Sequence, residues 1–277
     1  MKSYLRFLRR NKLYTTIEVV GLSIALAFVI ILGAVLIDKS QVNDNIKDAD
    51  EIYSMYVDTD WAGSISGTFC NMDEILPTIP QVREWCQFYG ALQLCLKTEK
   101  NDSLLVAPMY VTPNYFTFLG FELTSGNASD ALQANDAVVL SRKVADALFP
   151  HEDPIGKTVS LPMTGDLSAA FLVTEIPDKK DYIAYRITGV IDGLGKCGLP
   201  EGDIYLKAVS NSMGRQECMF RTDSPDNVDA ILRSIRNYPA ADEYDRRSLQ
   251  ESGIIPFENL KDGEIDCPGY RHISDPV

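Results

Sequence analysis

The segment ALFPHEDPIGKTVSL, residues 147–161, holds the densest group of side chains that could carry out chemistry. Its His-Glu-Asp run at 151–153 offers an imidazole and two carboxylates, the groups that ligate metals and transfer protons. Its Gly-Lys-Thr run at 156–158 has the residue types that end a phosphate-binding loop. The segment therefore raises two hypotheses, a metal site and a nucleotide site, and each requires a particular spacing.

The spacing supports neither site. A phosphate-binding loop needs a glycine five residues before Gly156, and that position is His151. Glu152 and Asp153 follow a single histidine on one turn, so these side chains cannot all converge on one metal. Pro154 stiffens the chain, and Gly156 permits the positive φ of a tight reversal. We therefore expect Pro154 and Gly156 to shape a structural turn, with no catalytic, cofactor-binding or metal-binding residue in it.

The remaining sequence offers no better set of catalytic or metal-binding residues. It has no Gly-x-Ser-x-Gly, His-Glu-x-x-His or Walker motif, and its two histidines are His151 and His272. The six cysteines form no Cys-x-x-Cys pair, which removes the usual zinc spacing; they are Cys70, Cys86, Cys95, Cys197, Cys218 and Cys267. We expect most of them to be free buried thiols, and we expect a protein that is not an enzyme and uses no cofactor.

Charge separates the first 40 residues from the rest of the chain. The 277 residues carry a formal net charge of −13, whereas residues 1–40 hold six basic and two acidic side chains. An acidic body repels phosphates, so nucleic acid is excluded as a partner. The acidic group near residue 48 is typical of a solvated linker rather than of a calcium site; its members are Asp44, Asp48, Asp50 and Glu51.

A membrane helix explains the basic start of the chain. Residues 19–37 form a run of 19 residues without a charge. A helix of this length spans about 28 Å, close to the roughly 30 Å hydrocarbon core of a bilayer. A cleaved signal peptide competes with this interpretation, but its apolar region is ~7–15 residues and ends at small residues. We therefore expect an uncleaved transmembrane helix at residues 17–37, in which the small residues Gly21 and Ala25 let another helix approach closely.

The basic residues before this helix set its direction. By the positive-inside rule, the flank at residues 1–16 stays in the cytoplasm and everything from about residue 40 is outside. The basic residues at the cytoplasmic interface are Arg6, Arg9, Arg10 and Lys12. The flank either lies on the anionic inner leaflet as an amphipathic helix or only sets the topology. The expected location is the cell inner (plasma) membrane, crossed once, with a periplasmic or other extracytoplasmic domain.

The pattern of residues 50–260 predicts an α+β domain. Strands are expected in the segments EIYSMYV, REWCQFYGALQLCLKTEKNDSLLVAPMYV, DAVVL, IAYRITGVI, GDIYLKAV and ECMFRTDS. Helices are expected in NMDEILPTIPQV, capped by Asn71 or Asp73, in SRKVADALF, capped by Ser141, and in PDNVDAILRSIRNY. Because these elements do not alternate as regular βαβ units, the α+β class is favoured over a parallel α/β sheet.

Four stretches resemble the N-terminal half of MacB/FtsX-type ABC transporter permeases. FLRRNKLYTTIEVVGLSIALA looks like the start of the first membrane span, and VNDNIKDADEIYSMYV looks like the segment that leads into the first extracytoplasmic strand. VTPNYFTFLGFELTSGN is similar to a third family stretch. AVVLSRKVADALFPHEDPIGKTVSL, followed by YRITGVI, is similar to the most specific family signature. The likeness covers most of residues 1–195 and is looser to about residue 260. It implies that the segment at 147–161 has a structural role.

The resemblance implies an architecture for the extracytoplasmic part. It implies a MacB-like periplasmic core domain at residues 50–260, joined to the span by a linker at 38–49 and followed by a C-terminal tail at 261–277. A split α+β subdomain would carry an inserted, mainly β subdomain; the split part takes about 50–105 and about 204–260, and the inserted part about 106–203.

The resemblance also implies a function and partners. Family members are permeases that work with a cytoplasmic ABC ATPase and couple ATP hydrolysis to extracytoplasmic motion, which exports or releases peptides, lipoproteins or drugs. The residues that carry this coupling would be the span and its junction near residues 38–51.

One feature departs from the family pattern, because no second apolar run follows the domain. The chain is then expected to be a fragment or truncated form of a permease, or a complete one-span protein. Its helix would pack on the helices of a companion permease, or self-dimerise, through Gly21 and Ala25. The alternative function is a single-pass, membrane-anchored extracytoplasmic interaction or sensor module without transport activity of its own.

Overall fold

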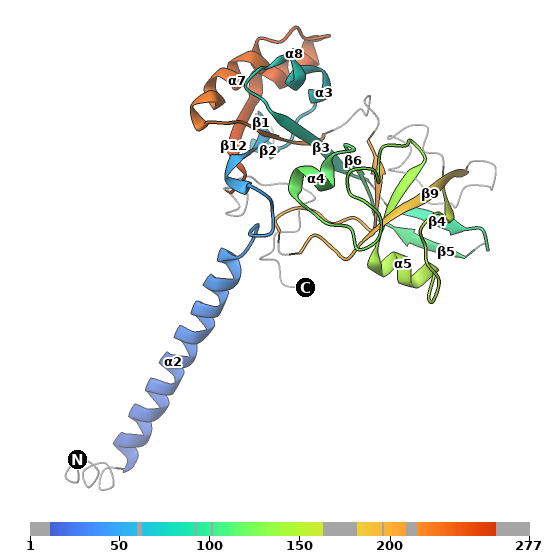
Figure 1. Cartoon of the computed structure of the whole chain (residues 1–277). Coiled ribbons are helices and arrows are strands. Elements are labelled where there is room, and N and C mark those ends of the chain that lie inside the picture. The colour runs from blue at the N-terminus through green and yellow to red at the C-terminus, as the bar shows by residue number, and fades with distance from the viewer. Residues whose placement is uncertain are drawn as a thin grey trace. The chain divides into compact units, whose positions relative to one another are not determined.

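The computed structural model describes residues 12–59, 63–91, 93–100, 102–162, 182–195, 197–208 and 215–258 (Figure 1). The chain divides into two compact units between Val42 and Asn43. The first unit contains an apolar helix, and the second is a domain of mixed strands and helices. The α+β class with one N-terminal apolar helix, expected from the sequence, is therefore confirmed.

The first unit contains α2 (Lys12–Ser40), a single helix of 29 residues. Its stretch Thr15–Ile37 has a mean hydropathy of 2.9, and by length and composition it is the one helix in the described residues that could cross a membrane. The described part of α2 thus contains the expected span at 17–37. Of the basic residues expected at the cytoplasmic interface, Lys12 begins this helix, and Arg6, Arg9 and Arg10 lie outside the described residues.

The second unit is built on one sheet, which has twelve strands in the described residues. In chain order these are β1 (Ile52–Thr59), β2 (Gly63–Ser66), β3 (Glu84–Gly90), β4 (Leu94–Thr98), β5 (Ser103–Val106), β6 (Pro108–Val111), β7 (Ala137–Ser141), β8 (Thr158–Pro162), β9 (Tyr182–Ile191), β10 (Ile204–Lys207), β11 (Glu217–Arg221) and β12 (Ser252–Pro256). Their spatial order is β12-β1-β11-β3-β6-β10-β7-β9-β8-β4-β5, with β2 beside β1. Among these pairs, β6 with β10 and β7 with β9 are parallel, and the others are antiparallel.

Short helices pack on this sheet. They are η1 (Ala49–Glu51), α3 (Met72–Ile75), η2 (Leu76–Thr78), α4 (Tyr115–Leu119), α5 (Arg142–Leu148), η4 (Pro225–Asn227), α7 (Val228–Arg236) and α8 (Glu243–Glu251). In Figure 1, α3, α7 and α8 gather beside β1 and β12, and α5 lies beneath β4, β5 and β9. The two groups of helices therefore cover opposite ends of the strand order.

Three hydrophobic clusters hold the helices to the sheet. One lies under α3, α7 and α8, where Ile231 and Ile235 of α7 pack with Phe220 of β11. A second lies under α5 and includes Val144. The third, the central cluster, contains Phe118 and other aromatic residues of α4 together with residues of β3, β6, β7 and β10. Complete burial of one such aliphatic or aromatic side chain contributes roughly 1.5–3 kcal/mol, so these clusters supply most of the favourable free energy.

Local capping confirms two of the expected helix starts. Asn71 caps α3, because its side-chain oxygen accepts a hydrogen bond from the Asp73 amide at 3.3 Å. Ser141 caps α5 by accepting from the Val144 amide at 3.4 Å. These short polar side chains satisfy amides that have no partner within the helix, which fixes where each helix begins.

Other elements were not expected from the sequence. The helix α8 and the edge strand β12 follow one another, and α8 buries only Ser248 and Leu249. Its sequence, EYDRRSLQE, has no apolar stripe of helical period, so the pattern carries no signal. The strands β4 and β5 lie beside β8 rather than beside β3. The expected inserted subdomain at about 106–203 stays a prediction, and its strand β8 pairs with β4 from the preceding segment.

The described cysteines are free thiols. Cys70, Cys86, Cys197 and Cys218 are buried and Cys95 is partly exposed, whereas Cys267 lies outside the described residues. Cys86 and Cys218 stand on neighbouring strands, but Cys86 is opposite Met219 and Cys218 is opposite Gln87. Since residues opposite each other share a face and successive residues alternate, the two thiols point to opposite faces and cannot be bridged. Burial raises the pKa of both thiols well above its usual value, so they stay protonated and unreactive.

Candidate coupling junction

The segment with the densest chemical side chains forms the turn between α5 and β8. Glu152 pairs with Lys157 and, at 3.1 Å, with Lys100 of the β4–β5 turn. These two lysines, Lys157 first, lower the pKa of the Glu152 carboxyl to about 2. Asp153 accepts a hydrogen bond from the Ile155 amide at 3.0 Å. Within the described part of the chain, no group of three or more His, Cys, Asp and Glu side chains is placed to hold a metal ion.

The turn depends on its backbone, and we expect a substitution of Gly156 to show this. Gly156 has φ of +80°, and its missing Cβ would meet no atom within 4 Å. Gly156→Val is therefore expected to lower the free energy of unfolding by about 1–3 kcal/mol through backbone strain alone. His151→Ala should stay within about ±0.5 kcal/mol, because His151 is exposed and both residues carry a Cβ at its φ of 122°. Denaturant unfolding measures both, and stoichiometric metal uptake that is lost in His151→Ala would contradict a structural turn.

Residues 43–51, here called the junction, follow α2 and begin the second unit. Ile46 is 5% exposed and belongs to the central cluster. The Lys47 amide donates to the carbonyl of Leu119 at 3.0 Å, and the Glu51 carbonyl accepts from the Thr222 amide at 3.4 Å. Asp44, Asp48 and Asp50 are exposed, whereas the backbone of the junction is docked on the domain.

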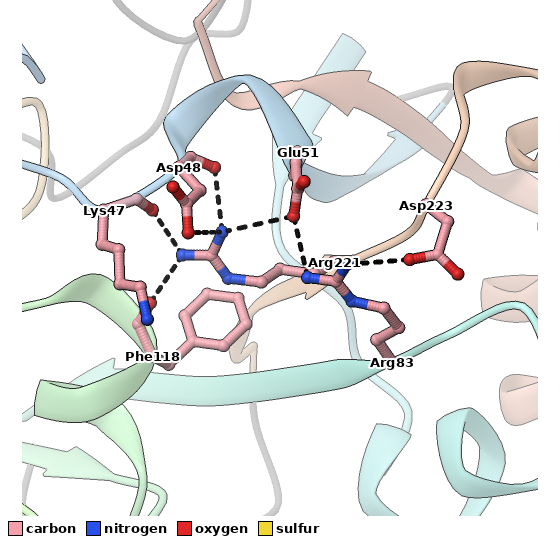
Figure 2. A network of polar contacts seen from close by, with 7 residues as sticks. All are labelled: Lys47, Asp48, Glu51, Arg83, Phe118, Arg221 and Asp223. Carbon is pink, nitrogen blue, oxygen red and sulfur yellow. Dashed lines mark hydrogen bonds and ion pairs between the residues drawn. The ribbon is translucent and has the colours of Figure 1, made fainter.

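Arg221 holds the junction from the last position of β11. It is only 3% exposed, and its guanidinium donates to the carbonyls of Lys47, of Asp48 at 2.9 Å and of Phe118 at 2.8 Å (Figure 2). The planar guanidinium carries five N–H donors in a fixed fork, so one side chain can serve several carbonyls at once. Arg221 therefore connects the junction to α4 and to β11, elements that are far apart in the sequence.

Carboxylates surround this buried cation. The Asp48 and Glu51 carboxylates lie 3.9 and 4.0 Å from the Arg221 guanidinium, and Phe118 places its ring centroid 5.0 Å from it. Arg83 also pairs with Glu51 and with Asp223, each at 2.8 Å. The Asp223 hydrogen bond, followed by the charge of Glu51, raises the pKa of Arg83. Figure 2 shows Glu51 between the two arginines, so the charge of Arg221 is compensated inside the network.

Two backbone positions give the junction its close fit. Asp48 has φ of 46°, a left-handed conformation that aspartate tolerates better than most residues, and it directs its carbonyl at Arg221. Gly120 ends α4 with φ of +79°, and a Cβ there would lie 2.6 Å from the Cβ of Lys47. A glycine is therefore required where α4 meets the junction.

The sequence indicated where the junction lies but not which residues hold it. The junction lies within the segment near 38–51 that the resemblance indicated, whereas Arg83, Gly120 and Arg221 were not singled out. Arg221 ends the strand ECMFR, in which all five residues are buried, but an arginine at a strand end carries no local sequence signal of that burial. The expected packing residues Gly21 and Ala25 lie on α2, and no atom lies within 4 Å of a Cβ built at Gly21.

Comparison with protein families assigns the chain to a class. Residues 15–238 match the MacB-like periplasmic core domain. This match spans more than half of the chain, so the chain belongs to the family of MacB-like periplasmic core domains, the extracytoplasmic part of ABC-transporter-type permeases. That family is a component of membrane permeases rather than a class of enzymes.

Two solved structures show the same fold, and a third is less similar. A domain of a protein described as a permease from Porphyromonas gingivalis has a TM-score of 0.55 and 18% identity, over 76% of this chain and 93% of that one. The periplasmic region of MacB from Actinobacillus actinomycetemcomitans has a TM-score of 0.50 and 14% identity, over 79% and 93%. The extracellular domain of the noncanonic ABC-type transporter YknZ from Gram-positive bacteria gives 0.48 and 12%, over 74% and 99%. No curated protein matches the chain.

Proposed function

We propose that this chain is a permease subunit, or the N-terminal part of one, of a MacB/FtsX-type ABC transporter. It couples ATP hydrolysis in the cytoplasm to motion of the extracytoplasmic domain, which exports or releases peptides, lipoproteins or drugs. The observation that carries the proposal is the docked junction: the segment after α2 is held by a buried arginine rather than left as a free linker. A tether needs no such attachment, whereas a part that transmits motion does.

The proposed partners follow from the same function. ATP hydrolysis requires a cytoplasmic ABC ATPase, which this chain reaches through a complete permease. The apolar stretch Thr15–Ile37 of α2 is exposed, so we propose that it packs against companion permease helices or a second copy of the chain. Helices gain little by leaving lipid, and close contact at small residues such as Gly21 and Ala25 is the driving interaction.

Co-purification from membranes tests this partnership. Wild-type chain is expected to bring down a permease and an ATPase, or a second copy of itself, and Gly21→Ile should weaken recovery because a branched side chain separates the helices. Gly33→Ile is the matched control, since Gly33 lies on a different face of α2 and a Cβ there also meets no atom within 4 Å. Recovery that is equal for all three proteins would remove the packing argument, and the absence of any ATPase would contradict the proposed function.

The proposed topology has the N-terminus in the cytoplasm and residues from about 40 onward outside the inner membrane. The basic flank before α2 supports this orientation. Protease added to spheroplasts should digest the domain and leave a tag at residue 1 protected. Digestion of the tag with protection of the domain would show the reverse orientation.

A further inference from the structure

The junction has a second attachment, made by two asparagines and separate from Arg221. The Asn45 side-chain amide donates to the carbonyl of Leu194 at 2.5 Å. The Asn43 side-chain oxygen accepts from the Gly198 amide at 2.8 Å. Both partners belong to the segment between β9 and β10, here called the β9–β10 loop and described at residues 192–195 and 197–203. The two bonds are called the asparagine attachment below.

The β9–β10 loop is itself fixed in the domain. Leu194, Cys197 and Leu199 are 1%, 7% and 6% exposed and belong to the central cluster. The Leu194 amide also donates to the Glu201 carboxylate at 2.7 Å. A loop whose side chains are packed in a core moves with the strands that it connects, because packed interiors deform little.

The two attachments reach different parts of the sheet. Arg221 ends β11, which lies between β1 and β3, whereas the β9–β10 loop continues from β9, which lies between β7 and β8. The strands β3, β6, β10 and β7 separate β11 from β9. The junction therefore contacts both the part of the sheet that carries α7 and α8 and the part that carries α5.

Asn43 is placed for this contact rather than for stability alone. It is 5% exposed, and its side-chain nitrogen has no hydrogen-bond partner among the described residues. A buried donor without a partner costs free energy, so the side-chain nitrogen does not explain why asparagine stands here. What Asn43 supplies is the acceptor for Gly198 and a backbone at φ of 72°, a left-handed conformation that asparagine tolerates.

We infer that the junction passes motion to the sheet through two separate outputs, Arg221 to the β11 side and the asparagine attachment to the β9–β10 loop. The inference rests on the proposed function, since it takes the junction to move when the partner ATPase binds ATP. Without the asparagine attachment, the β9–β10 loop would keep only the packing it shares with Ile46 in the central cluster, while Arg221 would still hold the β11 side by hydrogen bonds.

Hydrogen exchange of the full chain and its co-purified partners, in nanodiscs with and without a non-hydrolysable ATP analogue, tests this. The test variant combines two substitutions. Asn43→Gly removes the acceptor for the Gly198 amide and adopts the left-handed backbone without strain. Asn45→Asp replaces the donor to the Leu194 carbonyl with an acceptor, which cannot form that hydrogen bond. Asp44→Asn is the matched control, because it makes the opposite exchange at the exposed neighbouring residue. Asn45→Asp alone is a milder variant that removes one bond at the surface.

In wild type and Asp44→Asn, the ATP analogue is expected to change exchange both in the junction and at the Gly198 amide. In the double variant the change should persist in the junction and at β11 and be strongly reduced in the β9–β10 loop, with a smaller reduction in Asn45→Asp. A loop that responds equally in all four proteins would overturn this inference alone. A wild-type junction that does not respond to the analogue would instead overturn the proposed function, and this inference with it.

Discussion

Replacing Arg221 with methionine is expected to lower the free energy of unfolding by about 3–5 kcal/mol, the largest effect of any single substitution in the junction network. Methionine keeps the apolar stem but removes every donor, so the carbonyls of Lys47, Asp48 and Phe118 lose their common partner. Asp48 and Glu51 then face each other without the cation between them. Chemical unfolding of the full chain in detergent, followed by tryptophan fluorescence, measures the loss.

Two further substitutions distinguish the contribution of the buried Arg221 from that of the exposed Arg83. Arg221→Lys keeps the charge but offers a single ammonium where three carbonyls need a fork, so its loss should be intermediate. Arg83→Met removes the other guanidinium in the same network, but Arg83 and its partners Glu51 and Asp223 are well exposed to water. Its effect should be far smaller, since exposed ion pairs contribute little. A loss for Arg83→Met equal to that for Arg221→Met would show that burial of Arg221 is not what stabilises the junction.

Gly120→Ala is expected to cost about 2–4 kcal/mol and to loosen the junction. The new Cβ would lie 2.6 Å from the Cβ of Lys47 and 3.3 Å from its amide nitrogen. Neither atom is the free end of a side chain, so the junction backbone has to move away from α4. That movement also weakens the hydrogen bond from the Lys47 amide to the carbonyl of Leu119.

Gly156→Ala is the matched control for Gly120→Ala. The two glycines have nearly the same φ, +79° and +80°, but a Cβ at Gly156 meets nothing within 4 Å. The Gly156→Ala variant therefore loses only the free energy of placing alanine in a left-handed conformation, about 1–2 kcal/mol, and has no steric clash with a neighbouring residue. The difference in unfolding free energy between the two variants measures the contact of α4 with the junction. Equal losses would mean that this contact adds nothing.

Much of the domain could be predicted because its sequence signals are local. Ser141 and Asn71 stand directly before apolar helical runs, and a short polar side chain at that position caps a helix whatever surrounds it. The strand order could not be predicted in the same way. The strands β4 and β5 come directly after β3 in the chain but lie at the far end of the sheet, and pairing between distant segments leaves no local pattern.

The candidate site was likewise predictable in part. The position of the junction after the apolar helix could be predicted from the resemblance to permeases, because it depends only on chain order. Arg221 could not, since its role arises from carbonyls that lie more than 100 residues away in the sequence. A single arginine at the end of a strand has the same sequence appearance whether it faces water or holds another segment.

The most direct test of the central claim, that the junction moves with the domain and passes on the motion of α2, is a pair of distances in the isolated complex. Labels on genetically encoded amino acids, which avoid the native cysteines, would be placed at Phe28 of α2, at Asp44 of the junction and at Asp136 before β7, all exposed positions. Binding of the ATP analogue should change the distance from Phe28 to Asp136 and leave the distance from Asp44 to Asp136 unchanged. A change in the distance from Asp44 that is as large as the change from Phe28 would contradict the claim, because the junction would then move independently of the domain.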